Sequence, residues 1–142
     1  MDQELVGRLR YSVTRLARLL RQQDESGLTP TTTAMLASIG RHGPITLGDL
    51  AAYEQVAPPT ITKSVDKLEA AGLVERIRDG VDRRVCRVNL TPAGRKQLDT
   101  NRSRRTAWLA RQLRALPPED IDTLAAAIEV LERLTTAPEP VR

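Results

Sequence analysis

The feature that most constrains the fold is a change in hydrophobic period at about residue 72. Residues 58–72 place apolar side chains three and four positions apart, which is the spacing of an amphipathic helix. Residues 73–77 and 85–90 instead alternate apolar and polar side chains, which is typical of short strands. The polar loop between the two strands contains the turn-forming pair Asp79-Gly80. We therefore expect a helix that leads directly into a β-hairpin.

The rest of the chain has helical spacing, interrupted by residues that start or stop helices. Thr29-Pro30, Thr46 and Thr91-Pro92 each place a capping hydroxyl at a helix start. Gly72 suits a left-handed helix end. At the Pro58-Pro59 pair we expect Pro58 to be the cap and Pro59 the first helical residue. The expected helices are residues 4–24, residues 30–42, a short segment from Thr46, residues 59–72, residues 92–116 and a last helix that ends near Thr136. We expect the tail that follows, residues 137–142, to fray.

The bulk composition indicates a soluble protein of one domain with an aliphatic core. The 142 residues suit one domain and include only three aromatic side chains, Tyr11, Tyr53 and Trp108. No apolar run reaches the roughly 18 residues that a membrane span needs, and the N-terminal sequence does not have the pattern of a signal peptide. A single cysteine, Cys86, excludes an internal disulfide. We expect a cytoplasmic protein, associated with the nucleoid and without a membrane partner.

The order of elements predicts a mainly α protein with a small β-hairpin wing (α+β), of the winged helix-turn-helix type. A short helix, a tight turn, a second helix and a β-hairpin form such a unit, and long amphipathic helices flank it. The net charge of +4 permits nucleic acid as a partner but does not by itself indicate it. The case for DNA therefore depends on where the charges lie.

The outer face of the predicted helix 58–72 carries side chains that suit a DNA-reading helix. When Ile61, Val65 and Leu68 face the core, polar side chains lie on the opposite face, where they can meet base edges and phosphates. Any surface helix has a polar outer face, so this helix alone leaves a purely structural role open. The residues on or beside the outer face are Pro59, Thr60, Thr62, Lys63, Asp66 and Lys67.

The loop of the predicted hairpin, about residues 78–85, carries arginines that suit the narrow minor groove of DNA. Arg83 and Arg84 lie close to Gly80, and the potential of a duplex is most negative in a narrow minor groove. Asp82 can pair with Arg84 and fix its direction. The alternative is an ordinary charged turn, but the helices that precede it favour a DNA-binding wing.

Three motifs resemble the MarR (multiple antibiotic resistance regulator) family. Residues 68–76, Leu-Glu-Ala-Ala-Gly-Leu-Val-Glu-Arg, are similar to its Leu-Glu, two residues, then Gly-Leu-Val-x-Arg pattern. Residues 82–84, Asp-Arg-Arg, followed by Leu-Thr-Pro-Ala-Gly at 90–94, resemble its wing, and residues 60–66 resemble its recognition helix. The resemblance implies a homodimer on pseudo-palindromic operator DNA, usually a repressor that a small ligand releases. With the charge pattern, it places the DNA contacts on Pro59, Thr60, Thr62, Lys63, Lys67, Arg83 and Arg84.

The chain departs from the family pattern at the start of its recognition helix. The family often has a Ser-type cap there, and this chain has Ala57-Pro58-Pro59. The two prolines remove two backbone N–H groups that could hold a phosphate at a helix N-terminus.

The helices at the two ends of the chain carry more apolar surface than one small domain needs. In isolation this pattern also fits an intramolecular bundle, whereas the resemblance implies a symmetric dimer with interleaved termini. We then expect one MarR-like domain in which residues 28–95 bind DNA and residues 1–27 and 96–142 form the dimer, with a small aromatic or amphipathic effector between these parts. The residues expected at the dimer interface are Leu5, Leu9, Leu16, Trp108, Leu109, Leu124, Ile128 and Leu131.

We expect no enzymatic activity, no cofactor and no metal. The sequence lacks a nucleophile elbow, a phosphate loop and a metal-spaced cluster. His42 is expected to be solvated at a helix end, and Cys86 to face the core as inert packing. The basic run in residues 95–105 fits a solvated helix face better than a further phosphate contact. A winged-helix module for protein–protein contact, without an operator of its own, is the alternative function.

Overall fold

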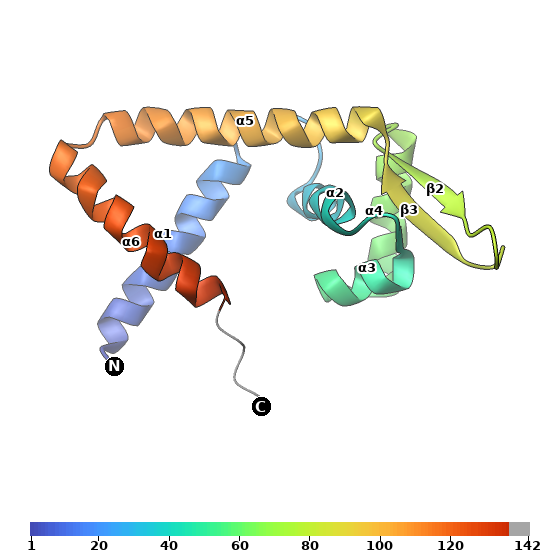
Figure 1. The fold of residues 1–142 in the computed structure, drawn as a ribbon, viewed down its shortest axis with the longest axis horizontal. Coiled ribbons are helices and arrows are strands. Elements are labelled where there is room, and N and C mark those ends of the chain that lie inside the picture. Colours follow the sequence, from blue (N-terminus) through green and yellow to red (C-terminus); the bar gives the residue numbers. More distant parts are fainter. Residues whose placement is uncertain (137–142) are drawn as a thin grey trace. The chain divides into compact units, whose positions relative to one another are not determined.

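The computed structural model describes residues 1–136, and its helices follow the predicted order (Figure 1). The elements are α1 (Gln3–Arg21), α2 (Pro30–His42), β1 (Ile45–Thr46), α3 (Leu47–Glu54), α4 (Pro58–Ala70), β2 (Val74–Arg78), β3 (Cys86–Leu90), α5 (Pro92–Arg114) and α6 (Pro118–Thr136). The chain divides into two compact units, residues 1–105 and residues 106–142, and α5 continues from the first into the second. The tail expected to fray, residues 137–142, lies outside the described residues.

Three predicted threonine caps are confirmed. Each threonine hydroxyl accepts a hydrogen bond from the backbone N–H three residues later, which satisfies one of the N–H groups that a helix start leaves unpaired. The caps are Thr29 (3.2 Å), Thr46 (3.1 Å) and Thr91 (3.1 Å). Gly72, with φ of 75°, has the predicted left-handed conformation after α4. Three helices end earlier than predicted, α1 at Arg21, α4 at Ala70 and α5 at Arg114.

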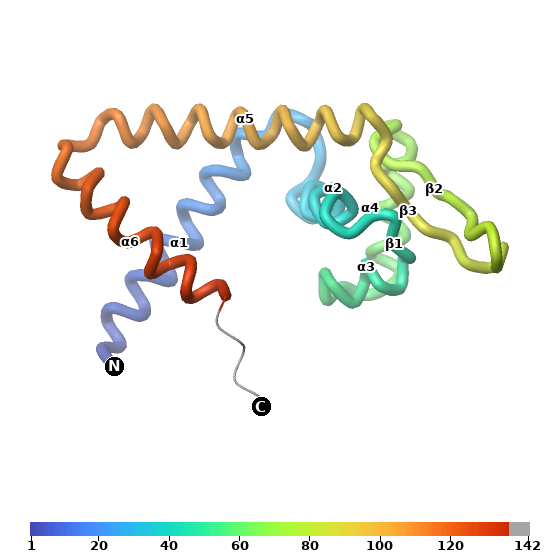
Figure 2. The backbone as a smooth tube through the Cα atoms, viewed as in Figure 1, coloured from blue at the N-terminus to red at the C-terminus, as the bar shows by residue number. Residues whose placement is uncertain are grey.

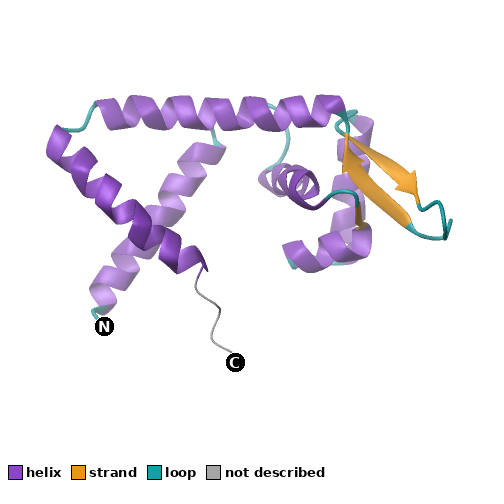
Figure 3. Cartoon of the chain, viewed as in Figure 1, coloured by secondary structure: helices purple, strands orange, loops and turns teal. Residues whose placement is uncertain are grey.

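The predicted β-hairpin is confirmed, and one further short strand joins it. β2 and β3 pair antiparallel from Val74 opposite Leu90 to Arg78 opposite Cys86. β1 pairs with the other edge of β3, Ile45 opposite Val88, so the strand order is β1-β3-β2 (Figure 2). Sequence periodicity did not predict β1, because two residues are too few to show an alternation. Figure 3 shows how the β2–β3 hairpin projects beyond the helices that it packs against.

The core of the first unit is aliphatic, as predicted, and it fixes the position of α4. Ile61, Val65 and Leu68 of α4 have no exposed surface and pack in one cluster with residues of α2, α3 and all three strands. Burial of a side chain of this size contributes roughly 1.5–3 kcal/mol, so these three side chains hold the inner face of α4 firmly. The other members of the cluster are Met35, Leu36, Ile39, Ile45, Leu50, Ala51, Val74 and Val88.

The second unit consists of the end of α5 and the whole of α6, joined by residues 115–117. α6 buries none of its side chains, and Leu124, Ile128 and Leu131 are 39–52% exposed. Trp108 and Leu109 on α5 are half-buried. Within residues 1–136, no helix combines the length and the apolar character that crossing a membrane requires.

Candidate nucleic-acid interface

The N-terminus of α4 differs from the prediction by one residue. Ala57 is the cap and Pro58 is the first helical residue, so the expectation that Pro58 would be the cap is wrong. Ala57 lies outside the helix and has a ψ of 141°. This is the extended conformation that a proline, here Pro58, favours in the residue before it. Ala57 has no side chain that can bond to the helix start, and both prolines lie in the first turn. Proline fits there because its fixed φ suits a helix and its missing N–H is not needed.

The outer face of α4 is accessible at every position that the sequence predicted. Pro59, Thr60, Thr62, Lys63 and Lys67 are all exposed. The hydroxyl of Thr62 donates to the carbonyl of Pro58 at 3.2 Å, so in this arrangement Thr62 has its lone pairs free for a partner. The five residues therefore share a surface that a DNA groove can reach, and their contact with DNA stays a prediction.

The loop of the β2–β3 hairpin is held by its own hydrogen bonds. The backbone N–H of Asp79 donates to the carbonyl of Val85 at 2.9 Å, and that of Val85 donates to the carbonyl of Asp82 at 3.0 Å. From β2, the Arg78 guanidinium donates to the carbonyl of Arg83 at 2.9 Å. These bonds give the wing a defined backbone, so the points from which Arg83 and Arg84 extend are set before any partner binds.

The predicted pair of Asp82 and Arg84 is present at the tip of the wing. Asp82 accepts from Arg84 Nε at 3.1 Å, from Arg84 Nη2 at 3.2 Å and from the backbone N–H of Arg84 at 3.0 Å. The same bonds from Arg84 lower the pKa of Asp82 from its usual value. The Arg84 side chain is nevertheless 91% exposed, so Asp82 orients a guanidinium that stays available to a further partner. Arg83, the other predicted wing contact, is also exposed.

A second wing carboxylate, Asp79, stabilises the loop. Its side chain accepts from the backbone N–H of Val81 at 2.9 Å and lies 3.6 Å from the guanidinium of Arg87. The bond from Val81 is the main reason why the pKa of Asp79 is lowered. Both wing carboxylates are therefore ionised at neutral pH.

An ion-pair cluster joins the recognition helix to the wing. Arg76 of β2 donates to Asp66 and to Glu69 of α4, each at 2.6 Å. The hydrogen bond that Arg76 donates to Asp66 is the largest cause of the raised pKa of Arg76. From the sequence, Asp66 was expected beside the DNA-reading face without a partner, and Arg76 had no predicted role. Their link was missed because the partners are seven and ten residues apart and come together only through the turn at Gly72.

Two arginines of the basic run in α5 are engaged in ion pairs within the first unit. Arg105 donates through Nε to Asp24 at 2.9 Å and through Nη2 to the other oxygen of the same carboxylate. Arg104 lies 2.9 Å from the carboxylate of Glu25. The Asp24 side chain is 7% exposed, so its bond with Arg105 is the better shielded of the two. These pairs fasten α5 to the segment between α1 and α2.

The lone histidine and the lone cysteine have structural surroundings. The ring of His42 is exposed, as predicted, and stacks on the ring of Tyr53 at a centroid distance of 4.2 Å. Cys86 is half-buried, less enclosed than the expected core position, and it stands at the start of β3, next to the loop of the hairpin. Among residues 1–136, no group of three His, Cys, Asp or Glu side chains is placed to hold a metal ion.

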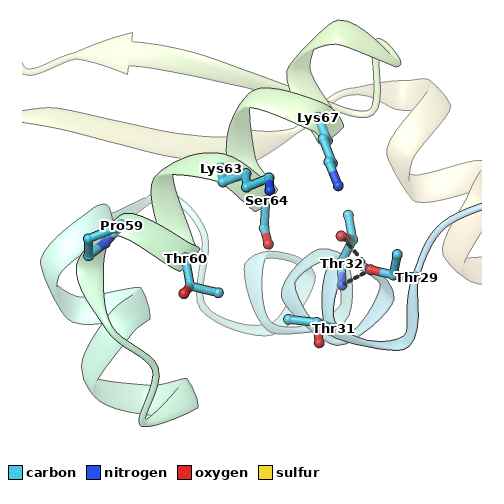
Figure 4. Close-up of a pocket in the computed structure, with 8 residues that line it drawn as sticks. All are labelled: Thr29, Thr31, Thr32, Pro59, Thr60, Lys63, Ser64 and Lys67. Atoms are coloured by element: carbon cyan, nitrogen blue, oxygen red, sulfur yellow. Dashed lines mark hydrogen bonds between the residues drawn. The ribbon is translucent and has the colours of Figure 1, made fainter.

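A notch of about 380 Å³ lies beside the outer face of α4 (Figure 4). It lies between α4, from Pro59 to Lys67, and the first turn of α2, and its lining contains two lysines and no carboxylate. From the sequence, Thr29 was predicted to cap α2, and the threonines that follow it had no predicted role. The lining residues are Thr29, Thr31, Thr32, Pro59, Thr60, Lys63, Ser64 and Lys67.

Comparison with known proteins places this arrangement in a family. The model of the MarR family matches residues 28–86, from α2 to the first residue of β3. An HTH-type transcriptional regulator of Mycobacterium leprae is 31% identical over 139 residues, covering 96% of this chain and 97% of the relative. The HTH-type transcriptional repressor MdtR of Bacillus subtilis is 30% identical over 121 residues, covering 85% of this chain and 76% of the relative.

A solved structure agrees with the sequence relatives. The crystal structure of a transcriptional regulator from Pseudomonas aeruginosa is similar to this chain with a TM-score of 0.82 and 32% identity, over 97% of each chain. The winged helix-turn-helix, the family match and relatives that span nearly the whole chain lead to one conclusion. This chain belongs to the MarR family of DNA-binding transcription regulators.

Proposed function

We propose that this regulator binds pseudo-palindromic operator DNA as a homodimer, and represses transcription until a small ligand releases it. The observation that carries the proposal is the Arg84 side chain, which Asp82 orients while 91% of it stays exposed. An arginine held in this way loses less entropy on entering a minor groove than a free one. An ordinary charged turn does not need such an arrangement.

The proposed DNA contacts come from two elements of the first unit. Residues 58–72 would enter the major groove with Pro59, Thr60, Thr62, Lys63 and Lys67, and residues 78–85 would reach the minor groove with Arg83 and Arg84. The exposure of all seven side chains supports this assignment. Threonine and lysine make fewer bidentate base contacts than arginine, asparagine or glutamine, so we expect modest base specificity from the helix itself.

The proposed dimer uses apolar side chains that the single chain leaves uncovered. Neither α6 nor α1 buries any of its side chains. On α1, Leu5, Leu9 and Leu16 are 41–58% exposed. Exposed apolar surface on this scale is unusual for a monomer and is typical of an interface. We propose a second copy as the occupant, with residues 1–27 and 96–142 forming the dimer and residues 28–95 binding DNA. Two recognition helices would then lie about one helical turn of DNA apart, roughly 34–36 Å.

Repression and release by a ligand are supported by family membership. MdtR, which is 30% identical to this chain, is named a transcriptional repressor. The ligand we propose is a small aromatic or amphipathic molecule, which suits the mainly apolar lining that small-molecule sites usually have.

Selection of DNA from a random library by the purified full-length protein tests the proposal. We expect the enriched duplexes to contain two inverted half-sites whose centres are about 10 base pairs apart. A library that yields no shared sequence, while the protein stays folded, would instead favour the protein–protein module. The same selection is repeated with Arg84→Ala. If Arg84 reads the minor groove beside each half-site, the base pairs that flank the half-site centres should no longer be enriched in this second selection.

A further inference from the structure

The start of the recognition helix cannot hold a phosphate with its backbone. Pro58 and Pro59 have no N–H group, and the N–H groups of Thr60 and Ile61 donate to the carbonyl of Ala57 at 3.0 and 3.3 Å. Helix N-termini often fix DNA-binding proteins on the phosphate backbone through free N–H groups. In this chain α4 has lost that capacity, so another group must hold the backbone beside it.

The first turn of α2 supplies a donor of the kind that α4 lacks. The N–H of Thr32 donates to the Thr29 hydroxyl at 3.2 Å, and the N–H of Thr33 donates to the Thr29 carbonyl at 2.9 Å. The N–H of Thr31 has no acceptor among the described residues. This free donor lies at the positive end of the dipole of a 13-residue helix, and Thr31 lines the notch.

An independent feature of the same notch indicates a ligand. Ser64 of α4 is only 6% exposed, and its hydroxyl makes no hydrogen bond to any described residue. Figure 4 shows that Ser64 points from α4 toward the first turn of α2. Among the described residues, only Asn101 Nδ2 is an unpartnered side-chain atom closed off from solvent, so the Ser64 hydroxyl keeps access to the notch and can donate to an acceptor that enters it.

The charge of the notch defines the chemistry of that acceptor. Lys63 and Lys67 line it, both are exposed at its rim, and no carboxylate faces it. A backbone N–H, a hydroxyl and two ammonium groups around one opening match the oxygen atoms of a phosphate. The notch borders the exposed face of α4, so the backbone flanking a groove occupied by α4 would pass over it.

We infer that this notch seats a phosphodiester of the DNA backbone, held by the Thr31 N–H, the Ser64 hydroxyl and Lys67. The inference rests on the proposed function, since it names a further contact of the same DNA-binding surface. The seat carries no sequence information. It sets the register of α4 in the groove, a task that the proline-containing start of α4 cannot perform.

A charge substitution in the first turn of α2 tests the seat with the full-length protein. Thr31→Asp places a carboxylate where the phosphate would lie, yet an acid in the first turn favours the helix, so the fold should persist by circular dichroism. The matched control is Ala34→Asp, which adds the same charge to an exposed position of α2 outside the notch. The probe is a random-sequence duplex of about 30 base pairs, and the salt slope is the change in the logarithm of its affinity with the logarithm of the salt concentration. We expect Thr31→Asp to weaken binding about tenfold and to reduce the magnitude of this slope by about one unit. We expect Ala34→Asp to change neither quantity. Equal effects of the two variants would overturn the inference.

Removal of the hydroxyl provides a variant without any change in charge. Ser64→Ala should weaken binding of the same duplex roughly threefold without a change in the salt slope, because a neutral donor releases no counterion. Unchanged affinity in Ser64→Ala would remove Ser64 from the seat. If wild type itself does not bind the duplex, the proposed function fails; if wild type binds and the variants match their controls, only the phosphate seat fails.

Inorganic phosphate distinguishes DNA from a free anion. In spectra of the ¹⁵N-labelled protein, we expect the Thr31 amide signal to shift on addition of the duplex and not with about 1 mM inorganic phosphate at constant ionic strength, because a single anion lacks the other contacts of the duplex. Saturable binding of inorganic phosphate in that range would assign the notch to a small anion and overturn the assignment to DNA.

Discussion

A methyl group on Gly94 would stand 1.9 Å from the carbonyl oxygen of Leu73, so the first turn of α5 lies directly against the segment between α4 and β2. The N–H of Thr91 donates to the same oxygen at 3.1 Å, and the Thr91 hydroxyl donates to the carbonyl of Gly72 at 2.6 Å. This junction explains why the Leu-Thr-x-x-Gly motif at residues 90–94 needs threonine and glycine at their positions. It couples the end of the recognition helix to the helix that leaves the first unit.

Gly94→Ala should therefore destabilise the first unit. Its methyl group would push the first turn of α5 away from the backbone of Leu73. Overpacking of this kind lowers the free energy of unfolding by about 1–3 kcal/mol. Urea unfolding followed by circular dichroism measures the change. The control is Gly48→Ala in α3, where the nearest atom is 4.0 Å away and alanine should raise stability by up to about 1 kcal/mol. Equal midpoints for wild type and Gly94→Ala would contradict the close contact.

The ion-pair cluster at Arg76 leads to a prediction about DNA affinity. Arg76→Met keeps the bulk of the side chain but leaves Asp66 and Glu69 unneutralised on the recognition helix. We expect binding of any duplex to weaken by about threefold to tenfold, because two free carboxylates would repel the phosphates. Asp66→Asn in the Arg76→Met background should recover much of the loss. Arg8→Met, which removes an exposed arginine of α1, is the control for net charge.

The effect of Arg76→Met on stability should be small and independent of pH. The pairs are partly exposed, so their contribution is about 1 kcal/mol or less. The pKa of Arg76 is raised in the folded protein, so this contribution is fully present below the ordinary arginine pKa and is lost only as pH rises through the higher folded value. Urea midpoints of wild type and variant should therefore differ by the same amount at about pH 6 and pH 9. A difference that shrinks between these values would contradict the pairing.

Sequence patterns predicted the features that depend on residues close together in the chain. They missed the features that depend on contacts between separate helices and strands. The stripe of Ile61, Val65 and Leu68 defined the inner face of α4 because helical spacing alone fixes it. The Asp82–Arg84 pair was predictable because its partners are two residues apart. The free hydroxyl of Ser64 was not, because its surroundings depend on how α2 packs against α4.

The two prolines illustrate a boundary that sequence rules place only approximately. The restriction that Pro59 puts on Pro58 favours an extended conformation, and this led to the prediction of Pro58 as the cap. In the structure Pro58 is helical, and Ala57 takes the extended conformation instead. The packing of Ile61 and Val65 holds the helix in register with the core and outweighs the local preference of one residue.

The pair at the wing tip predicts non-additive effects on DNA binding. Arg84→Ala should weaken operator binding by roughly 1–3 kcal/mol, as expected for a lost groove contact. Asp82→Asn should weaken it less, since the arginine remains but is less firmly held. Because Asp82 acts through Arg84, the double variant should bind no more weakly than Arg84→Ala alone. Fluorescence anisotropy at fixed salt measures all four affinities, and additive losses would show that Asp82 has a separate role.

The same pair predicts how DNA binding depends on acid. Arg84 lowers the pKa of Asp82 from 3.8, so the orienting interaction is present above the ordinary carboxylate pKa and is lost only as pH falls through the still lower folded value. The ratio of affinities of wild type and Asp82→Asn should therefore stay constant between about pH 6 and pH 8. A ratio that changes in this interval would show that another titrating group controls the wing.

The exposed face of α6 predicts the oligomeric state. Leu124, Ile128 and Leu131 lie on one side of the helix by their spacing, and Ile128 is 52% exposed. Ile128→Glu would place a charge in the proposed dimer interface, where desolvation without a partner is costly, so we expect a monomer by sedimentation velocity at micromolar concentration. Ala126→Glu adds the same charge to the opposite, exposed side of α6 and should leave the dimer intact. The core of the first unit contains no residue of α6, so Ile128→Glu should keep its helical circular dichroism while losing operator affinity, because each copy then binds one half-site alone. A dimeric Ile128→Glu protein would mean that this face is not the interface.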